Sequence, residues 1–133
     1  MSHPATRNEK LQAHLLAIYQ ICSEHQVARA KEIAARLNVR PYAVTAALRT
    51  LGEMGLINYA PYDVITLTPA GEKKARLIQE RQAALENFFI QVLGADQDEA
   101  KQAAASLEVH MPQSILDRMI RFPRPDSIQE ENA

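Results

Sequence analysis

Five basic side chains gather between residues 29 and 49, where they could neutralise the phosphates of a nucleic acid. They are Arg29, Lys31, Arg36, Arg40 and Arg49, and the segment holds one acidic residue, Glu32. Such charge contacts supply much of the affinity of DNA-binding proteins. The pattern therefore indicates a nucleic-acid-binding segment, although a solvated helix face would carry similar charges.

The same segment has the spacing of two short helices joined by a tight turn. Apolar residues recur at core spacing as Ile33, Ala34 and Leu37, and then as Val44, Leu48 and Leu51. Asn38 tolerates the left-handed backbone of a sharp helix end, and Pro41 suits the first turn of a new helix. Gly55 then ends the second helix. This layout is typical of a helix-turn-helix, whose second helix enters the DNA major groove.

Two β-favouring runs follow, at residues 57–59 and 64–67, and the turn residues 60–63 separate them. Two helices followed by a hairpin form a winged helix-turn-helix. The turn contains no lysine or arginine, so we expect phosphate contacts from the helices rather than from the wing tip.

The predicted DNA-contacting residues lie on or beside the second helix. They are Lys31, Arg40, Pro41, Tyr42, Ala43, Thr45 and Arg49. We expect Arg40 and Arg49 to hold phosphates, and Tyr42 and Thr45 to reach base edges. Ala43 or Ala46 could contact a thymine methyl group. Packing of Tyr42 against the preceding helix is an equally good interpretation.

The rest of the chain reads as further helices, so the expected fold is mainly α with a small β-wing. We expect helices over 8–24, from Thr68-Pro69 to Gly94, after Asp96 to about 110, and over 113–122. The predicted domains are 8–70, a winged helix-turn-helix, and 71–122, a helical dimerisation domain. Residues 1–7 and the polar tail 123–133 are expected to be disordered.

The predicted second domain carries more apolar residues than so small a domain can bury alone. The residues in question are Leu85, Phe88, Phe89, Ile115, Met119 and Ile120. We expect them to form a two-fold homodimer, as many proteins that bind two DNA half-sites do.

Composition restricts the function further. The 133 residues have a net charge of −1, one cysteine and no tryptophan. No apolar run is long enough for a membrane span, and a lone cysteine suits a reducing compartment, so a cytoplasmic protein is expected. No catalytic grouping of residues occurs at usable spacing, so we do not expect an enzyme.

The chain resembles the iron- and manganese-dependent repressors of the DtxR/MntR family over about Lys10 to Phe122. The resemblance rests on AIYQI, EIAARLNV-PYAVTAALRTLGEMGLI, ITLTPAGEKKA, LENFFIQVLG and LEVHMPQSILDRM. It implies a winged helix, a helical dimerisation region, and a metal ion bound between the two.

The family's ligand positions match poorly, however. They fall on Ala13, Leu16, Gln82, Ala105, Glu108 and Val109, so Glu108 is the one strong ligand retained. Alanine, leucine and valine cannot bind a divalent cation, and hard cations prefer carboxylate and imidazole. We therefore expect no metal, no cofactor and metal-independent DNA binding, with direct packing at these positions instead.

A site shifted by one residue, built from His14, Glu108 and His110, is the weaker alternative. One residue rotates a helix position by ~100°, which points each group away from the old site. Glu108 is then an ordinary surface acid. The predicted function is a dimeric, sequence-specific repressor of transcription that binds double-stranded DNA. The alternative is a winged-helix protein-interaction module without operator binding.

Overall fold

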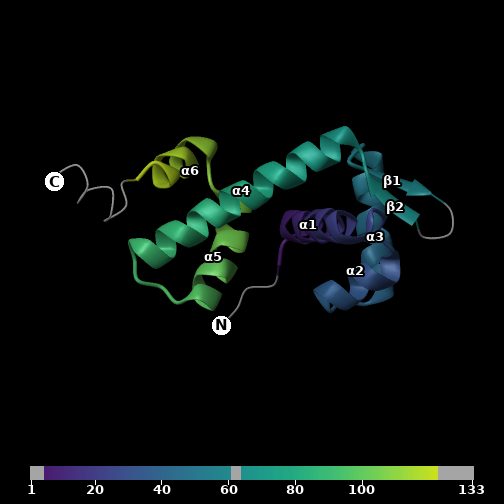
Figure 1. The fold of residues 1–133 in the computed structure, drawn as a ribbon, viewed down its shortest axis with the longest axis horizontal. Helices are drawn as coiled ribbons and strands as arrows, with labels where there is room; N and C mark the ends of the chain where they lie inside the picture. The colour runs from purple at the N-terminus through teal and green to yellow at the C-terminus, as the bar shows by residue number, and fades with distance from the viewer. Residues whose placement is uncertain (1–4, 61–63, 123–133) are drawn as a thin grey trace. The chain divides into compact units, whose positions relative to one another are not determined.

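The computed structural model describes residues 5–60 and 64–122, so the expectations for the N-terminal four residues, the wing tip and the tail lie outside the described residues. Backbone contacts divide the chain into two compact units, Met1–Ile78 and Gln79–Ala133. We call them the winged-helix unit and the C-terminal unit (Figure 1). The expected mainly helical fold with a small β-wing is confirmed.

The winged-helix unit contains α1 (Arg7–His25), α2 (Ala30–Leu37), α3 (Pro41–Glu53), β1 (Ile57–Ala60) and β2 (Val64–Leu67). The two strands pair antiparallel, with Ile57 opposite Leu67 and Ala60 opposite Val64. The first helix begins at Arg7 rather than at residue 8, because the Thr6 side chain accepts a hydrogen bond from the Glu9 amide at 3.2 Å.

The turn between α2 and α3 forms as the sequence predicts. Asn38 adopts φ 54° and ψ 48°, the left-handed conformation, and Pro41 is the first residue of α3. The Val39 amide donates to the Ala34 carbonyl at 3.1 Å, which closes the end of α2. Gly55 takes φ 76° after the end of α3.

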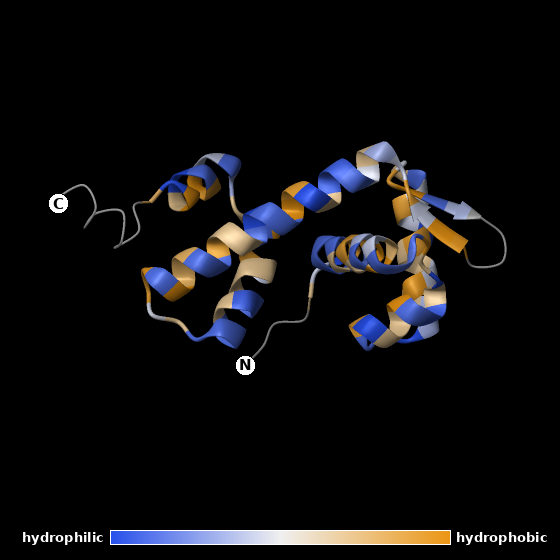
Figure 2. Cartoon of the chain, in the orientation of Figure 1, coloured by the Kyte–Doolittle hydropathy of each residue, from blue (hydrophilic) through white to orange (hydrophobic). Residues whose placement is uncertain are grey.

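One hydrophobic cluster joins all elements of the winged-helix unit. Its most enclosed side chains include Ile18, Ile33, Leu48 and Ile65, each 0% exposed. Figure 2 shows the consequence for the hairpin, where β2 is hydrophobic along most of its length. α1 buries His14, Leu15, Ala17, Ile18 and Ile21.

The long helix α4 (Pro69–Gln91) starts in the winged-helix unit. The Thr68 hydroxyl donates to the Gly55 carbonyl at 2.7 Å and accepts from the Gly71 amide at 3.0 Å, as expected for the cap. A Cβ at Gly71 would lie 1.8 Å from the Leu56 carbonyl oxygen. This close approach requires glycine and fixes the start of α4 against the residue that precedes β1.

The C-terminal unit consists of the second half of α4, α5 (Gln97–His110) and α6 (Gln113–Ile120). Asp96 caps α5 by accepting from the Glu99 amide at 2.8 Å, as expected. Its cluster is built on five buried residues, Leu85, Phe89, Ala100, Ala104 and Leu116. The expectation that Leu85 and Phe89 face a partner is wrong, because they face this cluster within the chain.

Candidate nucleic-acid interface and ligand groups

Helix α3 presents one face to the core and the other to solvent. Val44, Ala47, Leu48 and Leu51 are buried, and this spacing leaves Tyr42, Thr45, Ala46 and Arg49 exposed. Six of the seven predicted contact residues are exposed, while Ala43 is only half-buried. Five of the seven lie on α3, Arg40 is its N-cap residue and Lys31 lies on α2, and their contact with DNA stays a prediction.

Tyr42 extends into solvent from the first turn of α3, with 74% of its surface exposed. The alternative of packing against the preceding helix is therefore not what the structure shows. A tyrosine in this position offers a ring and a hydroxyl group to a ligand.

The hydroxyl group of Thr45 is already used as a hydrogen-bond donor. It donates to the Pro41 carbonyl at 3.2 Å, so in this state Thr45 offers an acceptor and a methyl group rather than a free donor. A methyl group can contact a thymine methyl, which was the role expected of the half-buried Ala43.

The basic residues of the segment divide into two kinds. The Arg36 guanidinium lies 3.0 Å from the Glu24 carboxylate, so part of its charge is compensated within the unit. The others, Arg29, Lys31, Arg40 and Arg49, are exposed, and no ion pair joins them to an acid in the described part of the chain. They are available to neutralise phosphates.

Cys22 on α1 is half-buried against the core of the winged-helix unit, where its sulfur approaches the Ile65 carbonyl oxygen at 3.8 Å. Burial, and after it the negative charge of Glu32, raise the pKa of the Cys22 thiol. A thiol with a raised pKa is a poor nucleophile and a poor metal ligand at neutral pH.

Glu108 in the C-terminal unit is not an ordinary surface acid, and that expectation is wrong. Its side chain is 2% exposed, and one carboxylate oxygen lies 3.6 Å from the guanidinium of Arg81 on α4. Glu108 follows Ala100 and Ala104 at intervals of four residues, so all three share the inward face of α5. That spacing was visible in the sequence and could have placed Glu108 inside.

His14 in the winged-helix unit is also buried, with 4% exposure. Its Nδ1 lies 2.6 Å from the Lys10 carbonyl oxygen, so Nδ1 carries the proton and donates. The other ring nitrogen, Nε2, is buried and has no hydrogen-bond partner among the described residues. An imidazole fixed in this way through a backbone carbonyl presents the lone pair that metal ions bind.

The positions that match the family's ligands supply little else. Ala13 and Ala105 are exposed, and Leu16 and Val109 are half-buried. Within residues 5–60 and 64–122 no group of three or more histidines, cysteines or acids is placed to hold a metal ion. The residues present therefore fit the family's ligand set only in part, through the chemistry of Glu108 and of the unmatched His14.

None of the helices in the described ranges is both long and apolar enough to cross a membrane.

Comparison with known proteins matches both halves of the chain to a pair of family models. Residues 8–65 match the N-terminal DNA-binding domain of iron-dependent repressors, and residues 68–124 match their metal-binding and dimerisation domain. The transcriptional regulator MntR of Salmonella typhimurium is 33% identical over 127 residues, which cover 96% of this chain and 80% of the relative.

An uncharacterised HTH-type transcriptional regulator of Methanocaldococcus jannaschii is 32% identical over 116 residues, covering 86% of this chain and 93% of that one. A manganese-dependent transcriptional repressor, solved in complex with manganese, superimposes with a TM-score of 0.71 at 27% identity. The match covers 85% of this chain and 53% of the solved chain, so this protein spans about half the length of that repressor.

These matches overturn one expectation. The model over residues 68–124 is described as a metal-binding domain, and the relatives include repressors named for manganese. The expectation of no metal and no cofactor is therefore wrong for a chain of this family. The loss of the matched ligands does not mean the loss of all ligands, and His14, which was expected to point away from the site, is buried.

Proposed function

The chain belongs to the iron-dependent repressor family and is a winged-helix DNA-binding regulator, and from this premise we propose that it represses transcription as a homodimer that reads its operator with α3. The observation that carries the proposal is the exposed face of α3. It bears Tyr42, Thr45 and Arg49 over a fully buried core side. The alternative, a protein-interaction module, is not favoured, because the family consists of DNA-binding repressors.

We propose two kinds of DNA contact. Lys31, Arg40 and Arg49 hold phosphates, since they are exposed and bear no ion pair in the described ranges. Tyr42, Thr45 and Ala43 meet base edges or thymine methyl groups from the first turns of α3, where Pro41 starts the helix.

The dimer would form through the C-terminal unit. Its exposed apolar side chains are Leu93, Leu107, Ile115, Ile120 and Phe122, each between 41% and 65% exposed. A second copy that covers them would give two recognition helices about 34 Å apart, one turn of DNA, or a simple multiple of it. As a DNA-binding repressor, the protein would act in the cytoplasm.

We propose metal binding because the matched family domain is described as a metal-binding domain. Repressors of this kind use a divalent ion to control DNA binding, and here Glu108 and His14 are the two groups whose chemistry suits such an ion. A bound ion would supply positive charge to a buried carboxylate or accept the lone pair of a fixed imidazole.

The experiment is selection of binding sequences from random duplex DNA, followed by titration of the enriched duplex with and without Mn²⁺ or Fe²⁺. We expect binding to a single enriched sequence with two-fold symmetry, tightened by at least one of the ions. Thr45→Ala should relax preference at one base position, whereas Arg49→Ala should weaken binding to all sequences and reduce the salt slope by about one unit. Selection that enriches no sequence would refute the proposed function.

A further inference from the structure

A third strand segment lies beside the hairpin, and sequence patterns gave no sign of it. The Ala28 amide donates to the Ile65 carbonyl at 2.9 Å, and the Ile65 amide donates to the Ala28 carbonyl at 2.9 Å. The two residues form an antiparallel bridge. In antiparallel register, Arg29 is then level with Val64, the first described residue of β2.

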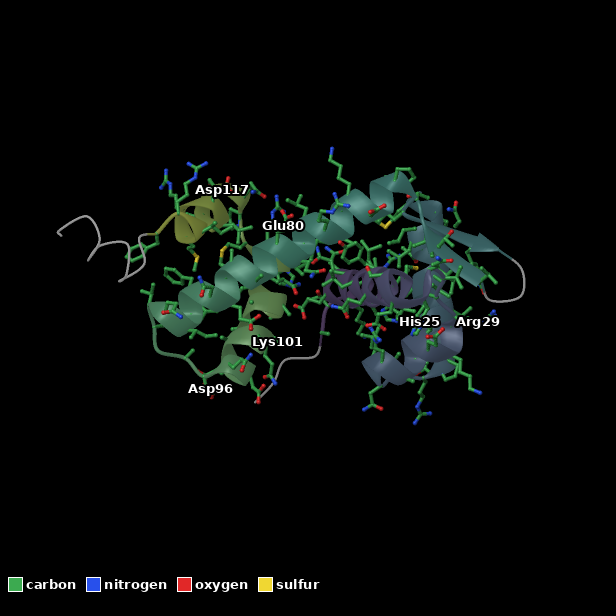
Figure 3. All side chains as sticks on the ribbon, viewed as in Figure 1. His25, Arg29, Glu80, Asp96, Lys101 and Asp117 are labelled. Carbon is green, nitrogen blue, oxygen red and sulfur yellow. The ribbon has the colours of Figure 1, made fainter. Side chains whose placement is uncertain are left out.

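The bridge also decides which way Arg29 faces. Ala28 and Ile65 are both 0% exposed and point into the core. Side chains alternate along an extended segment, and Arg29 is extended at φ −125° and ψ 147°, so its side chain faces outward. Arg29 is exposed, and in Figure 3 it is labelled at the outer edge of the winged-helix unit.

The hairpin itself offers no positive charge where it is described. Strands β1 and β2 have the sequences INYA and VITL, without lysine or arginine. On their outward face the Asn58 amide donates to the Thr66 hydroxyl at 3.2 Å, so these polar groups satisfy one another. The charge that a wing needs for phosphate is missing from the hairpin and is present one strand away, on Arg29.

We propose that Arg29 is the phosphate-contacting residue of the wing, placed there by the Ala28–Ile65 bridge. This inference rests on the proposed function, because it assigns a further contact to the same DNA complex. The guanidinium would donate to phosphate oxygens of the backbone beside those held by α3, as a bidentate pair or a single charged hydrogen bond. It adds affinity for any sequence and no base preference.

The test compares two variants that remove the same charge. Arg29→Gln removes the proposed contact, and Arg118→Gln removes an exposed arginine from α6 in the C-terminal unit. Affinity for the enriched duplex is measured between ~50 and ~300 mM KCl with Mn²⁺ present, and phosphate ethylation interference is mapped for each protein. For Arg29→Gln we expect the log–log salt slope to become shallower by about 0.9 per bound protomer.

With Arg29→Gln, ethylation should stop interfering at certain phosphates, and with Arg49→Gln it should still interfere at these positions. The interference pattern of Arg118→Gln should match that of the wild type. Arg29→Lys should retain the slope, because the charge remains. Thermal unfolding checks that each variant is folded. If the wild type binds but Arg29→Gln and Arg118→Gln have equal slopes and patterns, the role of Arg29 is refuted and the proposed function stands. A wild type that binds no duplex refutes both.

Discussion

The winged-helix unit is built on a cluster of fourteen buried hydrophobic residues, whereas the cluster of the C-terminal unit is built on five. The C-terminal unit also leaves Leu107, Ile115, Ile120 and Phe122 between 41% and 50% exposed. The two units therefore differ in the size of their cores, and the second has exposed apolar side chains beside a small core. The unit that carries the proposed DNA contacts thus has the larger core, and the unit that carries the proposed dimer surface has the smaller one.

The largest expected effect is on the free energy of unfolding, and it compares substitutions in the cores of the two units. All four tyrosines precede residue 63, so tyrosine fluorescence reports on the winged-helix unit alone. Leu48→Ala should lower the free energy of unfolding of that unit by ~2–5 kcal/mol, because Leu48 is fully buried in its cluster. Leu116→Ala, in the smaller cluster, should shift the tyrosine-detected urea midpoint much less. Equal shifts would show that the units unfold as one block.

The next largest effect on stability is expected at the close contact between Gly71, at the start of α4, and Leu56. Gly71→Ala should cost about 3 kcal/mol, because its Cβ would collide with the Leu56 carbonyl and the backbone must move. Gly52→Ala is the matched control, since nothing lies within 4 Å of its Cβ and it sits inside α3. That substitution should be neutral or stabilise by ~0.5–1 kcal/mol. If urea unfolding finds the two variants equally stable, the close packing of Gly71 against Leu56 is contradicted.

The exposed apolar surface of the C-terminal unit gives a third effect. Ile115→Asp should weaken a dimer formed through it by ~1.5–3 kcal/mol per copy, the value of one buried side chain. Ser114→Asp adds the same charge at the neighbouring exposed position without removing apolar surface. Sedimentation at tens of micromolar should find Ile115→Asp mostly monomeric and Ser114→Asp dimeric. If the wild type sediments as a monomer, the proposed dimer is refuted.

The smallest expected effect comes from two helix N-caps, one in each unit, that make a side-chain hydrogen bond. Thr6 and Asp96 each accept a hydrogen bond from the third amide of the helix they cap, at 3.2 Å and 2.8 Å. Replacement of either by alanine should cost about 1 kcal/mol. By tyrosine-detected unfolding, Thr6→Ala should register and Asp96→Ala should be nearly silent. A comparable loss from Asp96→Ala would mean that helix α5 supports the winged-helix unit.

The sequence predicted the winged-helix unit well because its signals are local. Asn38, Pro41 and Thr68 each carry a backbone preference that acts within a few residues, and each does in the structure what its type predicts. The positions of Val44, Leu48 and Leu51 follow from helix periodicity alone. Non-local pairing was not visible, so the bridge between Ala28 and Ile65 went unseen.

The buried polar side chains were harder to predict from the sequence. Glu108 was assigned to the surface because a glutamate is usually exposed, and His14 was set aside because one residue rotates a helix position by ~100°. Both are buried, each beside groups that compensate its polarity in part, the guanidinium of Arg81 and the carbonyl of Lys10. Which apolar residues face inward on α4 also depends on where α5 and α6 pack, which no single helix encodes.

The bridge between Ala28 and Ile65 also has a consequence for hydrogen exchange. The hairpin can close by itself, but the Ile65 amide is protected only when residues 28 and 65, distant along the chain, are held together. The chain between these two residues contains α2, α3 and β1, so the contact forms when these elements are packed together. The Ile65 amide should therefore exchange only when the whole unit opens, and its exchange rate would report the unit's global stability.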